Sequence, residues 1–344
     1  MMPDRVHVLI ASPLEADLAA RIDAVDPRVT VLYEPELLPR PRYPADHTGV
    51  PREMSAGQLA RWSRLRRQAD VSFDFDWLDP ARMPENCPRL RWVQATSAGV
   101  GAFMERAGLA DSQLVVTTAA GVHGVPLAEF TLLGLLYFAK KMPTLASWKA
   151  ARHWQRHASG EFAGTRVLVV GLGGVGRQVA RLLAAAGAIV TGVGRPGRRY
   201  EVPGVSEVVT TDRLDAALPA ADALVLACPL TSRTRGLIGA REIALLPRGA
   251  VLVNVSRGAV VDEAALEQAV ASGHLGGACL DVFTAEPLSA TSPLWGLENV
   301  IISPHSAATV TGENARITDI FCDNLRRWLD GQPLRNTYDR AEGY

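Results

Sequence analysis

Short apolar runs alternate with longer amphipathic stretches along most of this chain. The short runs are rich in Val, Leu and Ile and are bounded by glycine or polar residues, which is typical of buried strands. The longer stretches carry apolar residues three and four positions apart, which predicts helices that bury one face. Because parallel strands need a crossover between them, strands that alternate with helices predict a doubly wound α/β fold.

The same pattern, together with capping residues, predicts where the elements begin and end. We expect strands at residues 5–10, 29–33, 69–73, 91–94, 114–117, 166–170, 188–193, 223–227, 250–255, 277–280 and 300–302. We expect helices at residues 14–25, 56–68, 126–141, 175–186, 237–245 and 263–272. Ser12 with Pro13, Pro126 and Asp262 are the expected start signals of three of these helices. The arginines of residues 56–68 are expected to form a solvated face.

Residues 166–187 combine a buried strand, a glycine turn and an amphipathic helix. Gly171, Gly173 and Gly176 have the G-x-G-x-x-G spacing. The first permits a tight turn, the second lets a pyrophosphate approach the backbone, and the third lets the helix pack on the strand. Free N–H groups at the helix start would bind the phosphates. In this setting we predict a dinucleotide site rather than a plain strand-to-helix turn.

The end of the following strand indicates which dinucleotide is bound. A carboxylate there would accept hydrogen bonds from the adenosine ribose, but this position holds none. Arg195, Arg198 and Arg199 stand there instead. Arginine binds a 2′-phosphate through charge-assisted hydrogen bonds, so NADP(H) is favoured and NAD(H) is possible. The alternative interpretation is a basic surface turn without a ligand.

Three polar residues, Arg257, Asp281 and His305, follow predicted strands further along the chain. The carboxyl ends of parallel strands lie at one edge of a sheet, so these side chains should converge. A histidine there can protonate the alkoxide that forms when a keto acid accepts a hydride, and an arginine can polarise the carbonyl. Glu286 is the nearest carboxylate that could orient the imidazole. Singly, each would be an ordinary surface arginine or turn histidine; together they favour a dehydrogenase site.

Two loops admit alternatives. The small residues at 96–101 leave backbone N–H groups that could hold an anion, or they form a tight turn without a ligand. Residues 34–55 are rich in proline and charge. We favour a solvated insertion for them over a lid or a subunit contact.

Composition narrows the class of protein. The chain has 344 residues, of which 48% are hydrophobic and 21% charged, enough for two domains of ordinary size. Lys plus Arg and Asp plus Glu both number 36, which argues against a nucleic-acid or membrane partner. The four cysteines show no paired spacing, so we expect neither disulfides nor a metal site. With no signal peptide and no long apolar segment, we expect a cytoplasmic protein.

Five stretches together resemble one enzyme family. They are GLGGVG (171–176), PLTSRTRGLIG (229–239), GAVLVNVSRGAVVDEAAL (249–266), GACLDVFTAEPL (277–288) and SPLWGLENVIISPHSA (292–307). Residues 165–308 are similar to the NAD(P)-binding domain of the D-isomer-specific 2-hydroxyacid dehydrogenases. Weaker matches at 92–101 and 126–133 extend the resemblance over most of the chain.

The resemblance implies two Rossmann-like, doubly wound parallel-sheet domains with a cleft between them. Residues 1–120 and 309–344 would form the substrate-binding (catalytic) domain, with a returning helix at about 313–330. Residues 121–308 would form the NAD(P)-binding Rossmann domain. A homodimer joined through the cofactor domain is typical of the family. No regulatory domain is expected after residue 344.

The resemblance also implies a role for each candidate. Arg257 would bind and polarise the substrate, His305 would donate or accept the proton, and Glu286 would be its partner. Expected cofactor contacts are Gly171, Gly173, Gly174, Val175, Gly176, Arg195, Arg198, Arg199, Cys228, Pro229, Thr234, Val255, Ser256, Asp281 and His305. Expected substrate contacts are Ala98, Gly99, Val100, His123 and Arg257.

The implied activity is hydride transfer between a nicotinamide dinucleotide and a small 2-keto or 2-hydroxy acid. The arginine-rich turn favours the glyoxylate/hydroxypyruvate reductase-like branch. Glu286 disfavours formate, because formate dehydrogenases of the family have glutamine there. Gly101 replaces an acidic residue of many relatives, which would alter the substrate pocket. The alternative is a dinucleotide-sensing corepressor with little turnover, which we disfavour because the sequence shows no partner-binding extension.

Overall fold

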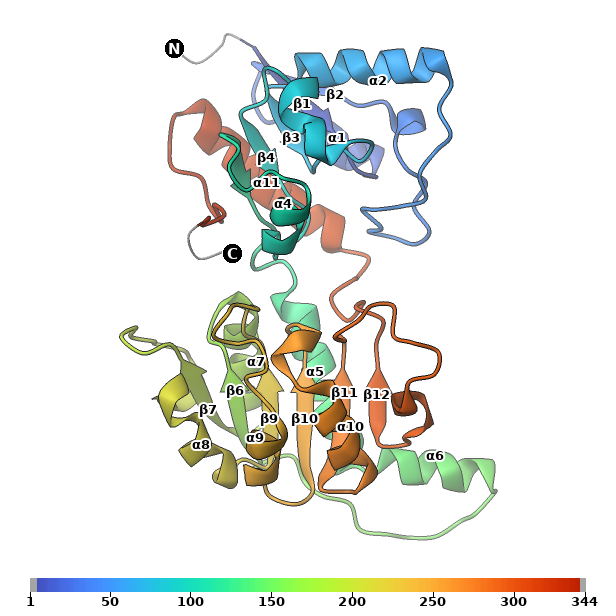
Figure 1. The fold of residues 1–344 in the computed structure, drawn as a ribbon, viewed down its shortest axis with the longest axis vertical. Coiled ribbons are helices and arrows are strands. Elements are labelled where there is room, and N and C mark those ends of the chain that lie inside the picture. The colour runs from blue at the N-terminus through green and yellow to red at the C-terminus, as the bar shows by residue number, and fades with distance from the viewer. Residues whose placement is uncertain (1–4, 341–344) are drawn as a thin grey trace. The chain divides into compact units, whose positions relative to one another are not determined.

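The chain divides into two compact units in the computed structural model, which describes residues 5–340 (Figure 1). Unit 1 comprises residues up to 123 and from 309 onward, and unit 2 comprises residues 124–308. Each unit is built around its own parallel β-sheet, as the alternating pattern predicts. The C-terminal segment therefore returns to the unit that begins the chain.

The described part of unit 1 contains a five-stranded parallel sheet in the order β2-β1-β3-β4-β5. Its strands are β1 (Val6–Ile10), β2 (Val29–Leu32), β3 (Val71–Phe73), β4 (Trp92–Gln94) and β5 (Val115–Thr117). Its α-helices are α1 (Ala16–Asp23), α2 (Ala56–Gln68), α3 (Met83–Asn86), α4 (Gly101–Arg106) and α11 (Glu313–Leu329). This is the strand order of a flavodoxin-like doubly wound sheet.

Aromatic packing attaches the C-terminal helix α11 to this sheet. Phe321 of α11 stacks on Trp92 of β4 with 5.1 Å between ring centroids. It also meets Phe73 of β3 edge-on, with 5.3 Å between centroids. All three rings are fully buried. Because large aromatic side chains bury the most apolar area per residue, this cluster stabilises the return of α11 to the sheet.

A buried hydrogen-bond network orients the same helix. Trp92 Nε1 donates to Thr117 Oγ1 at 2.7 Å, and that hydroxyl donates to Gln94 Oε1 at 2.8 Å. Asn324 of α11 also donates to Gln94 Oε1, at 3.2 Å, and accepts the backbone N–H of Arg335 at 2.8 Å. Because an unsatisfied buried polar group is costly, this network favours a single position of α11 on the sheet.

One arginine of α2 contradicts the expected solvated face. Arg66 is buried and pairs with Asp76, with 2.6 Å between Nη1 and Oδ2. Trp62 donates its indole N–H to the other carboxylate oxygen at 3.0 Å. Arg64 and Arg67 are exposed, as predicted. The helical pattern could not show this burial, because the partner carboxylate lies in a loop after β3.

Residues 124–308 form a seven-stranded parallel sheet in the order β12-β11-β10-β9-β6-β7-β8. Its strands are β6 (Arg166–Val170), β7 (Ile189–Gly194), β8 (Val205–Thr210), β9 (Ala223–Leu226), β10 (Ala250–Asn254), β11 (Leu275–Leu280) and β12 (Val300–Ile302). Its α-helices are α5 (Gly124–Ala139), α6 (Met142–Ala150), α7 (Gly174–Ala185), α8 (Leu214–Ala217), α9 (Ala240–Leu245) and α10 (Glu263–Ala271). The apolar pattern did not predict β8, because this edge strand buries none of its side chains.

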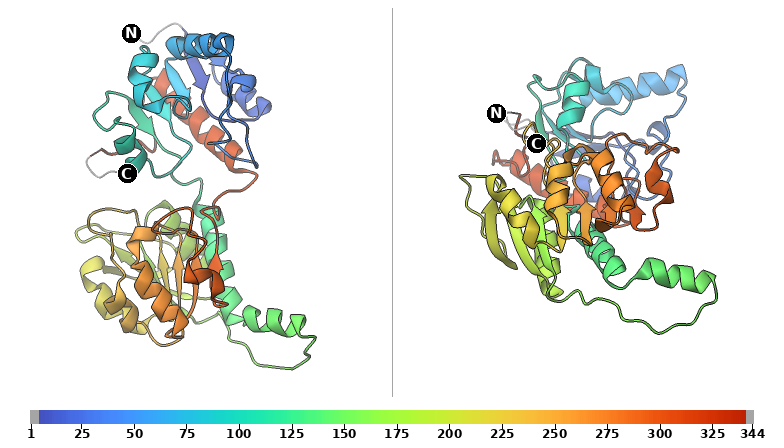
Figure 2. Two further views of the ribbon diagram at one scale, coloured as in Figure 1. Left: turned by 45° about the vertical axis from the view of Figure 1, so that its right-hand side comes forward. Right: turned by 60° about the horizontal axis from the view of Figure 1, so that its bottom comes forward.

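The strand β6 shows how helices cover both faces of this sheet. Leu168 and Val170 face a core cluster that includes residues of α8, α9 and α10. Val167 and Val169 face a cluster that includes residues of α5 and α7. Figure 2 shows the two helical layers on either side of the strands. Burial on both faces explains why the strand has a continuous apolar sequence.

The order of strands places a topological switch point between β6 and β9. From β6 the chain runs outward through β7 and β8, then returns to β9 and runs through β10, β11 and β12 in the opposite direction. Doubly wound sheets bind ligands at the carboxyl ends of the strands beside such a point. The segments that follow β6, β7, β9, β10, β11 and β12 are therefore the ones that can form a site.

Two expected helix starts are wrong, and one is confirmed. α1 begins at Ala16, and Ser12 is buried without capping a helix. Pro126 is the third residue of α5 rather than its first. Asp262 does cap α10 by accepting the backbone N–H of Ala265 at 3.2 Å.

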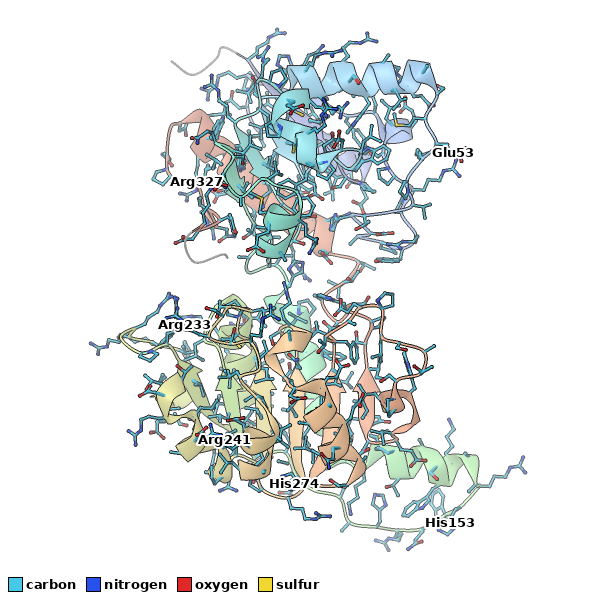
Figure 3. The ribbon with its side chains drawn as sticks, in the orientation of Figure 1. Glu53, His153, Arg233, Arg241, His274 and Arg327 are labelled. Carbon is cyan, nitrogen blue, oxygen red and sulfur yellow. The ribbon has the colours of Figure 1, made fainter. Side chains whose placement is uncertain are left out.

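The helix α6 and the segment after it extend away from the sheet of unit 2 (Figures 1 and 2). No residue of α6 is buried, and Trp154 is 96% exposed. Figure 3 labels His153 on the same segment. This part of the chain therefore presents a large surface that its own unit does not cover.

Replacing Asp76 with alanine should destabilise the protein strongly. The change leaves the buried guanidinium of Arg66 without its carboxylate, which costs about 3–5 kcal/mol. Urea unfolding of the wild type and of Asp76→Ala measures the difference. Asp111→Ala removes an exposed carboxylate in the same unit and should change stability by less than about 0.5 kcal/mol. A similar small effect at Asp76 would contradict the importance of this pair.

Candidate active site

The glycine turn lies at the switch point of unit 2. Gly171 follows β6 with φ of +96°, and a Cβ on it would lie 2.7 Å from the backbone of Cys228. A Cβ on Gly176 would lie 1.8 Å from the carbonyl oxygen of Gly171. Only glycine fits both positions. The helix α7 begins at Gly174 with Gly173 as its N-cap. Its free N–H groups therefore fit a pyrophosphate.

The loop after β9 is shaped by hydrogen bonds of its own. Thr234 Oγ1 donates to the carbonyl of Pro229 at 2.6 Å and accepts the backbone N–H of Thr231 at 2.8 Å. Cys228 is buried beside Gly171. The expected adenosine-side residues Cys228 and Pro229 thus stand at the carboxyl end of β9, while Thr234 determines the shape of the loop.

The basic segment after β7 is next to the glycine turn, because β7 pairs with β6. Arg198 lies over the ring of Tyr200, with 5.5 Å between Cζ and the ring centroid. The side chain of Arg199 is 92% exposed. The backbone N–H of Arg195 donates to the Tyr200 hydroxyl at 3.0 Å. The segment therefore has an ordered geometry of its own.

Asn254, the last residue of β10, shapes the turn that carries Arg257. Its Oδ1 accepts the backbone N–H and the hydroxyl of Ser256 at 3.0 and 2.7 Å. Its Nδ2 donates to the carbonyl of Arg257 at 3.1 Å. A Cβ on Gly258 would lie 1.9 Å from the carbonyl carbon of Phe283. The turn is thereby held closely against the segment after β11.

Arg257 places a positive charge beside two carboxylates. Its Nη1 donates to the carbonyl of Ser256 at 2.7 Å. Burial lowers the pKa of the Arg257 guanidinium, whereas the charges of Glu286 and Asp281 oppose that shift. Because arginine stays protonated in proteins, this edge of the sheet keeps a fixed positive charge. A planar guanidinium suits bidentate binding of a carboxylate.

His305 and Glu286 form a hydrogen-bonded pair, with 2.8 Å between Nδ1 and Oε2. Glu286 Oε1 accepts the backbone N–H of Phe283 at 3.1 Å. His305 has φ of +55°, which is uncommon for a residue with a side chain. Its side chain is 47% exposed, so the imidazole is accessible. A strained residue held by its surroundings is typical of functional positions.

The buried Asp281 holds the turn in which His305 lies. Its backbone carbonyl accepts the N–H of His305 at 2.9 Å. Its Oδ1 accepts the hydroxyl of Ser303 at 2.7 Å and the N–H of Ala307 at 2.9 Å. The aspartate expected to contact the nicotinamide therefore also positions the histidine.

The small-residue loop of unit 1 leaves backbone donors available. Among the described residues, none accepts a hydrogen bond from the backbone N–H of Ala98 or Gly99. The flanking residues are held: the Thr96 hydroxyl donates to a carboxylate after β3 at 2.8 Å, and the Ser97 carbonyl accepts a backbone N–H at 3.0 Å. Val100 is buried. A loop whose ends are fixed by hydrogen bonds and whose backbone N–H groups are free is suited to binding an anion.

His123 belongs to a buried cluster of unit 1 that the sequence did not predict. Its Nε2 lies 3.1 Å from Oε1 of Glu313, the first residue of α11, and Nε2 of His47 lies 3.5 Å from the same oxygen. Burial alone would raise the pKa of the Glu313 carboxyl, but the two imidazoles outweigh it and lower this pKa to about 2. The favoured interpretation of residues 34–55 as a solvated insertion is therefore wrong at His47.

Four residues that shape these sites escaped the sequence analysis. Asn254 and Gly258 flank the turn of Arg257, and their signals were local: an Asn at a strand end favours a side-chain turn, and a glycine beside it permits close approach. His47 and Glu313 lie in segments far apart in the sequence. No local pattern could have paired them.

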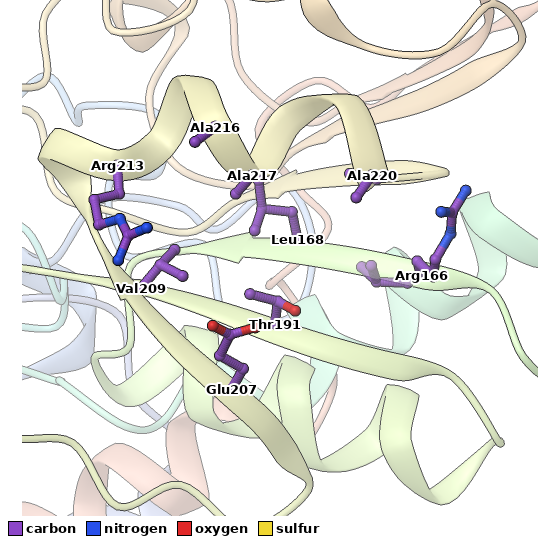
Figure 4. Close-up of a pocket in the computed structure, with 11 residues that line it drawn as sticks. Arg166, Leu168, Thr191, Glu207, Val209, Arg213, Ala216, Ala217 and Ala220 are labelled. Atoms are coloured by element: carbon purple, nitrogen blue, oxygen red, sulfur yellow. The ribbon is translucent and has the colours of Figure 1, made fainter.

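A pocket in unit 2 lies apart from these residues (Figure 4). It is lined by the first residues of β6, by Thr191 of β7, by Glu207 and Val209 of β8, and by Arg213 and the alanines of α8 and the turn after it. None of the predicted site residues lines it. The candidate site is therefore defined by the polar groups at the strand ends.

Within residues 5–340, no group of three or more His, Cys, Asp or Glu is arranged to hold a metal ion. In the same range, no helix combines the length and the apolar character that crossing a membrane requires. All four cysteines are buried free thiols.

A family model described as "D-isomer specific 2-hydroxyacid dehydrogenase, NAD binding domain" matches residues 132–307. This chain belongs to that family. The D-isomer specific 2-hydroxyacid dehydrogenases are oxidoreductases that act on 2-hydroxy acids with a nicotinamide dinucleotide.

Similar proteins support the family assignment along most of the chain. The glyoxylate reductase of Aeropyrum pernix is 32% identical over 80% of this chain and 84% of its own. The (S)-sulfolactate dehydrogenase of Chromohalobacter salexigens is 36% identical over 64% of this chain and 71% of its own. A solved D-isomer specific 2-hydroxyacid dehydrogenase of Xanthobacter autotrophicus Py2, in complex with NADPH and MES, is 30% identical, with a TM-score of 0.78 and coverage of 99% and 100%.

These findings confirm the predicted family, the fold of two parallel-sheet α/β domains, and an NAD(P)-dependent oxidoreductase of 2-hydroxy acids rather than a corepressor. The roles of individual residues and the preference for NADP(H) stay predictions.

Glu313→Gln should remove a pH-dependent part of the stability. The carboxyl has a pKa of about 2 in the folded chain against an ordinary value of 4.5, so its contribution is complete above pH 4.5 and is lost as the pH falls toward 2. The variant should be less stable than the wild type above pH 4.5, and the difference should shrink as the pH falls below that value. Urea unfolding at pH 7, 5, 4 and 3 measures it. Glu105→Gln, at an exposed position of unit 1, is the control and should follow the wild type.

Proposed function

We propose that this protein reduces small 2-keto acids to D-2-hydroxy acids and catalyses the reverse oxidation, with NADP(H) preferred and NAD(H) possible. The observation that carries the proposal is the pair of His305 Nδ1 and Glu286 Oε2, 2.8 Å apart. Arg257 stands at the same edge of the sheet, after β10, and the glycine turn stands there after β6. Acid–base, anion-binding and dinucleotide-binding groups thus share one set of strand ends.

His305 is the proposed proton donor in reduction and base in oxidation. A carboxylate can only accept hydrogen bonds, so Glu286 orients the imidazole with Nδ1–H toward itself. The Nε2 atom is then available to exchange a proton with the substrate oxygen. The negative charge of Glu286 also favours the protonated imidazole that the reduction requires. Exposure of the ring allows the proton to be replaced from solvent.

Arg257 is the proposed anchor and polarising group. Its guanidinium would pair with the substrate carboxylate and draw electron density from the neighbouring carbonyl. The buried hydrogen bonds of Asn254 hold the turn that carries it, so little reorganisation is needed on binding. A 2-keto acid presents the carboxylate and the carbonyl that this arrangement would recognise.

The dinucleotide contacts follow from the strand ends. We propose that the backbones of Gly174 and Val175 meet the pyrophosphate, and that Val255, Ser256 and Asp281 stand on the nicotinamide side. When bound, the nicotinamide supplies or accepts the hydride. The solved relative in complex with NADPH supports the preference for the phosphorylated dinucleotide.

The proposed substrate-binding domain comprises residues 1–120 and 309–344, which belong to unit 1, and residues 121–308 are the proposed cofactor domain. Free N–H groups support Ala98, Gly99 and Val100 as a carboxylate-binding loop. His123 is proposed as a further substrate contact. The glyoxylate reductase and sulfolactate dehydrogenase among the relatives suggest small acids such as glyoxylate as first substrates to test.

Replacing the acid–base residue should nearly abolish activity. His305→Gln should lower kcat/KM for glyoxylate reduction by about 10²–10⁴-fold, because the variant supplies no proton to the developing alkoxide. Arg257→Ala should lose activity through the missing carboxylate partner. Steady-state rates with NADPH and with NADH measure both effects, over glyoxylate, hydroxypyruvate and related keto acids.

His274→Gln is the matched control for the histidine. His274 precedes β11, at the opposite end of the strands from the candidate site, and Figure 3 labels it. This variant should keep wild-type kcat/KM. Near-wild-type turnover by His305→Gln would show that His305 is not the acid–base residue. Absence of turnover of any keto acid by the wild type would favour the corepressor alternative.

We further propose a cytoplasmic homodimer joined through the cofactor domain. The free thiols suit a reducing compartment. Leu133 of α5, Met142 of α6 and Trp154 are 57%, 40% and 96% exposed, and exposed apolar side chains of this kind support a protein contact. A second copy of the chain is the proposed occupant of this surface.

Trp154→Glu should weaken the dimer, because it would place a charge in an apolar interface. Light scattering after size-exclusion chromatography should show the wild type at twice the chain mass and the variant shifting toward the monomer on dilution. Trp295→Glu changes another exposed tryptophan, 56% exposed, and should stay dimeric. A monomeric wild type would refute this contact.

A further inference from the structure

The segment after β7 is built around one aromatic ring. Tyr200 packs against Gly194, the last residue of β7: a Cβ on that glycine would lie 2.3 Å from Cε2 of the ring. The Tyr200 hydroxyl accepts the backbone N–H of Arg195 at 3.0 Å. The segment thus folds back on itself, and the ring covers the carboxyl end of the strand.

Hydrogen bonds of a second side chain connect this segment to the glycine turn. Arg177 of α7 donates from Nη1 to the carbonyl of Glu201 at 2.9 Å and from Nε to the carbonyl of Leu172 at 3.1 Å. Leu172 is the residue between the first two glycines of the turn, and its side chain packs against Gly192 of β7. The ring of Tyr200 is therefore held at a defined position relative to the turn that would bind the pyrophosphate.

The two arginines that precede the ring differ in their surroundings. Arg198 lies over the face of Tyr200, with 5.5 Å between Cζ and the ring centroid. The side chain of Arg199 is 92% exposed, and its Nε lies 3.8 Å from Oε1 of Glu201, which is itself 86% exposed. Stacking on an aromatic face restricts the plane and the direction of a guanidinium in advance. These two consecutive arginines therefore differ in how far their side chains are ordered.

We propose that Arg198, rather than Arg199, binds the 2′-phosphate of the adenosine ribose, and that Tyr200 is the positioning residue that holds its guanidinium. The inference rests on the proposed preference for NADP(H). The second strand of a dinucleotide fold ends where the ribose 2′ position is recognised, and β7 is that strand here. Stacking lowers the conformational entropy that Arg198 loses when it forms its charge-assisted hydrogen bonds.

The test compares two nucleotides that differ by the one phosphate. Titration calorimetry with adenosine 2′,5′-bisphosphate and with adenosine 5′-monophosphate isolates binding of the 2′-phosphate from catalysis. The wild type should bind the bisphosphate more tightly. Arg198→Ala should lose about 10- to 100-fold in affinity for the bisphosphate, the range for hydrogen bonds to charged groups. Arg199→Ala is the matched control and should lose less than about twofold.

Variants of the ring separate positioning from general structure. Tyr200→Leu removes the aromatic face and should weaken bisphosphate binding about two- to fivefold, as expected for an exposed cation–π contact. Its affinity for the monophosphate should not change. Tyr200→Phe keeps the aromatic face and should bind the bisphosphate more tightly than Tyr200→Leu does. The same order should appear in KM for NADPH, with kcat little changed.

The results that would contradict this inference differ from the result that would contradict the NADP(H) preference. Equal losses in Arg198→Ala and Arg199→Ala, or wild-type bisphosphate affinity in Tyr200→Leu, would overturn the inference while leaving the cofactor preference intact. If Tyr200→Leu weakened the binding of the bisphosphate and of the monophosphate equally, the ring would have only a structural role, and the inference would also be overturned. A wild type that binds the two nucleotides equally would refute the NADP(H) preference and this inference together.

Discussion

The hydrogen bonds of Asp281 to the turn after β12 are the constraint on which the candidate active site depends. The carbonyl of Asp281 accepts the N–H of His305, and the carboxylate accepts hydrogen bonds from Ser303 and Ala307 on either side of it. This arrangement holds His305 at a positive φ and so directs its Nδ1 toward Glu286. A buried acceptor on one strand thereby determines the conformation at the end of its neighbour.

The same principle operates at the other strand ends of unit 2. The Asn254 side chain donates a hydrogen bond to the turn that carries Arg257. The hydroxyl of Tyr200 accepts a backbone N–H from the basic segment after β7. Where the chain leaves a parallel strand, its backbone N–H and C=O groups lose their hydrogen-bond partners on the neighbouring strands. Side chains from the strand or from the following loop then replace those partners. Because all these strands point the same way, their supported turns meet at one edge of the sheet, where the proposed chemistry takes place.

The sequence predicted those features that depend on neighbouring residues. The glycine turn, most strands and the cap at Asp262 agree with the structure because their patterns are local. The predictions for Arg66 and Ser12 were wrong because both residues are buried in the folded unit. The pairing of His47 with Glu313 joins two ends of unit 1 and left no local trace.

By itself, the sequence determined the alternation of strands and helices, the glycine turn, and which polar residues follow which strands. These depend on periodicity and on the conformational freedom of glycine, which a short window of sequence contains. Only the tertiary structure decided which arginine stacks on Tyr200, which atoms of His305 and Glu286 lie 2.8 Å apart, and that His123 meets Glu313. Such contacts arise between segments that approach one another only when the sheet assembles, so their geometry is a property of the packed chain.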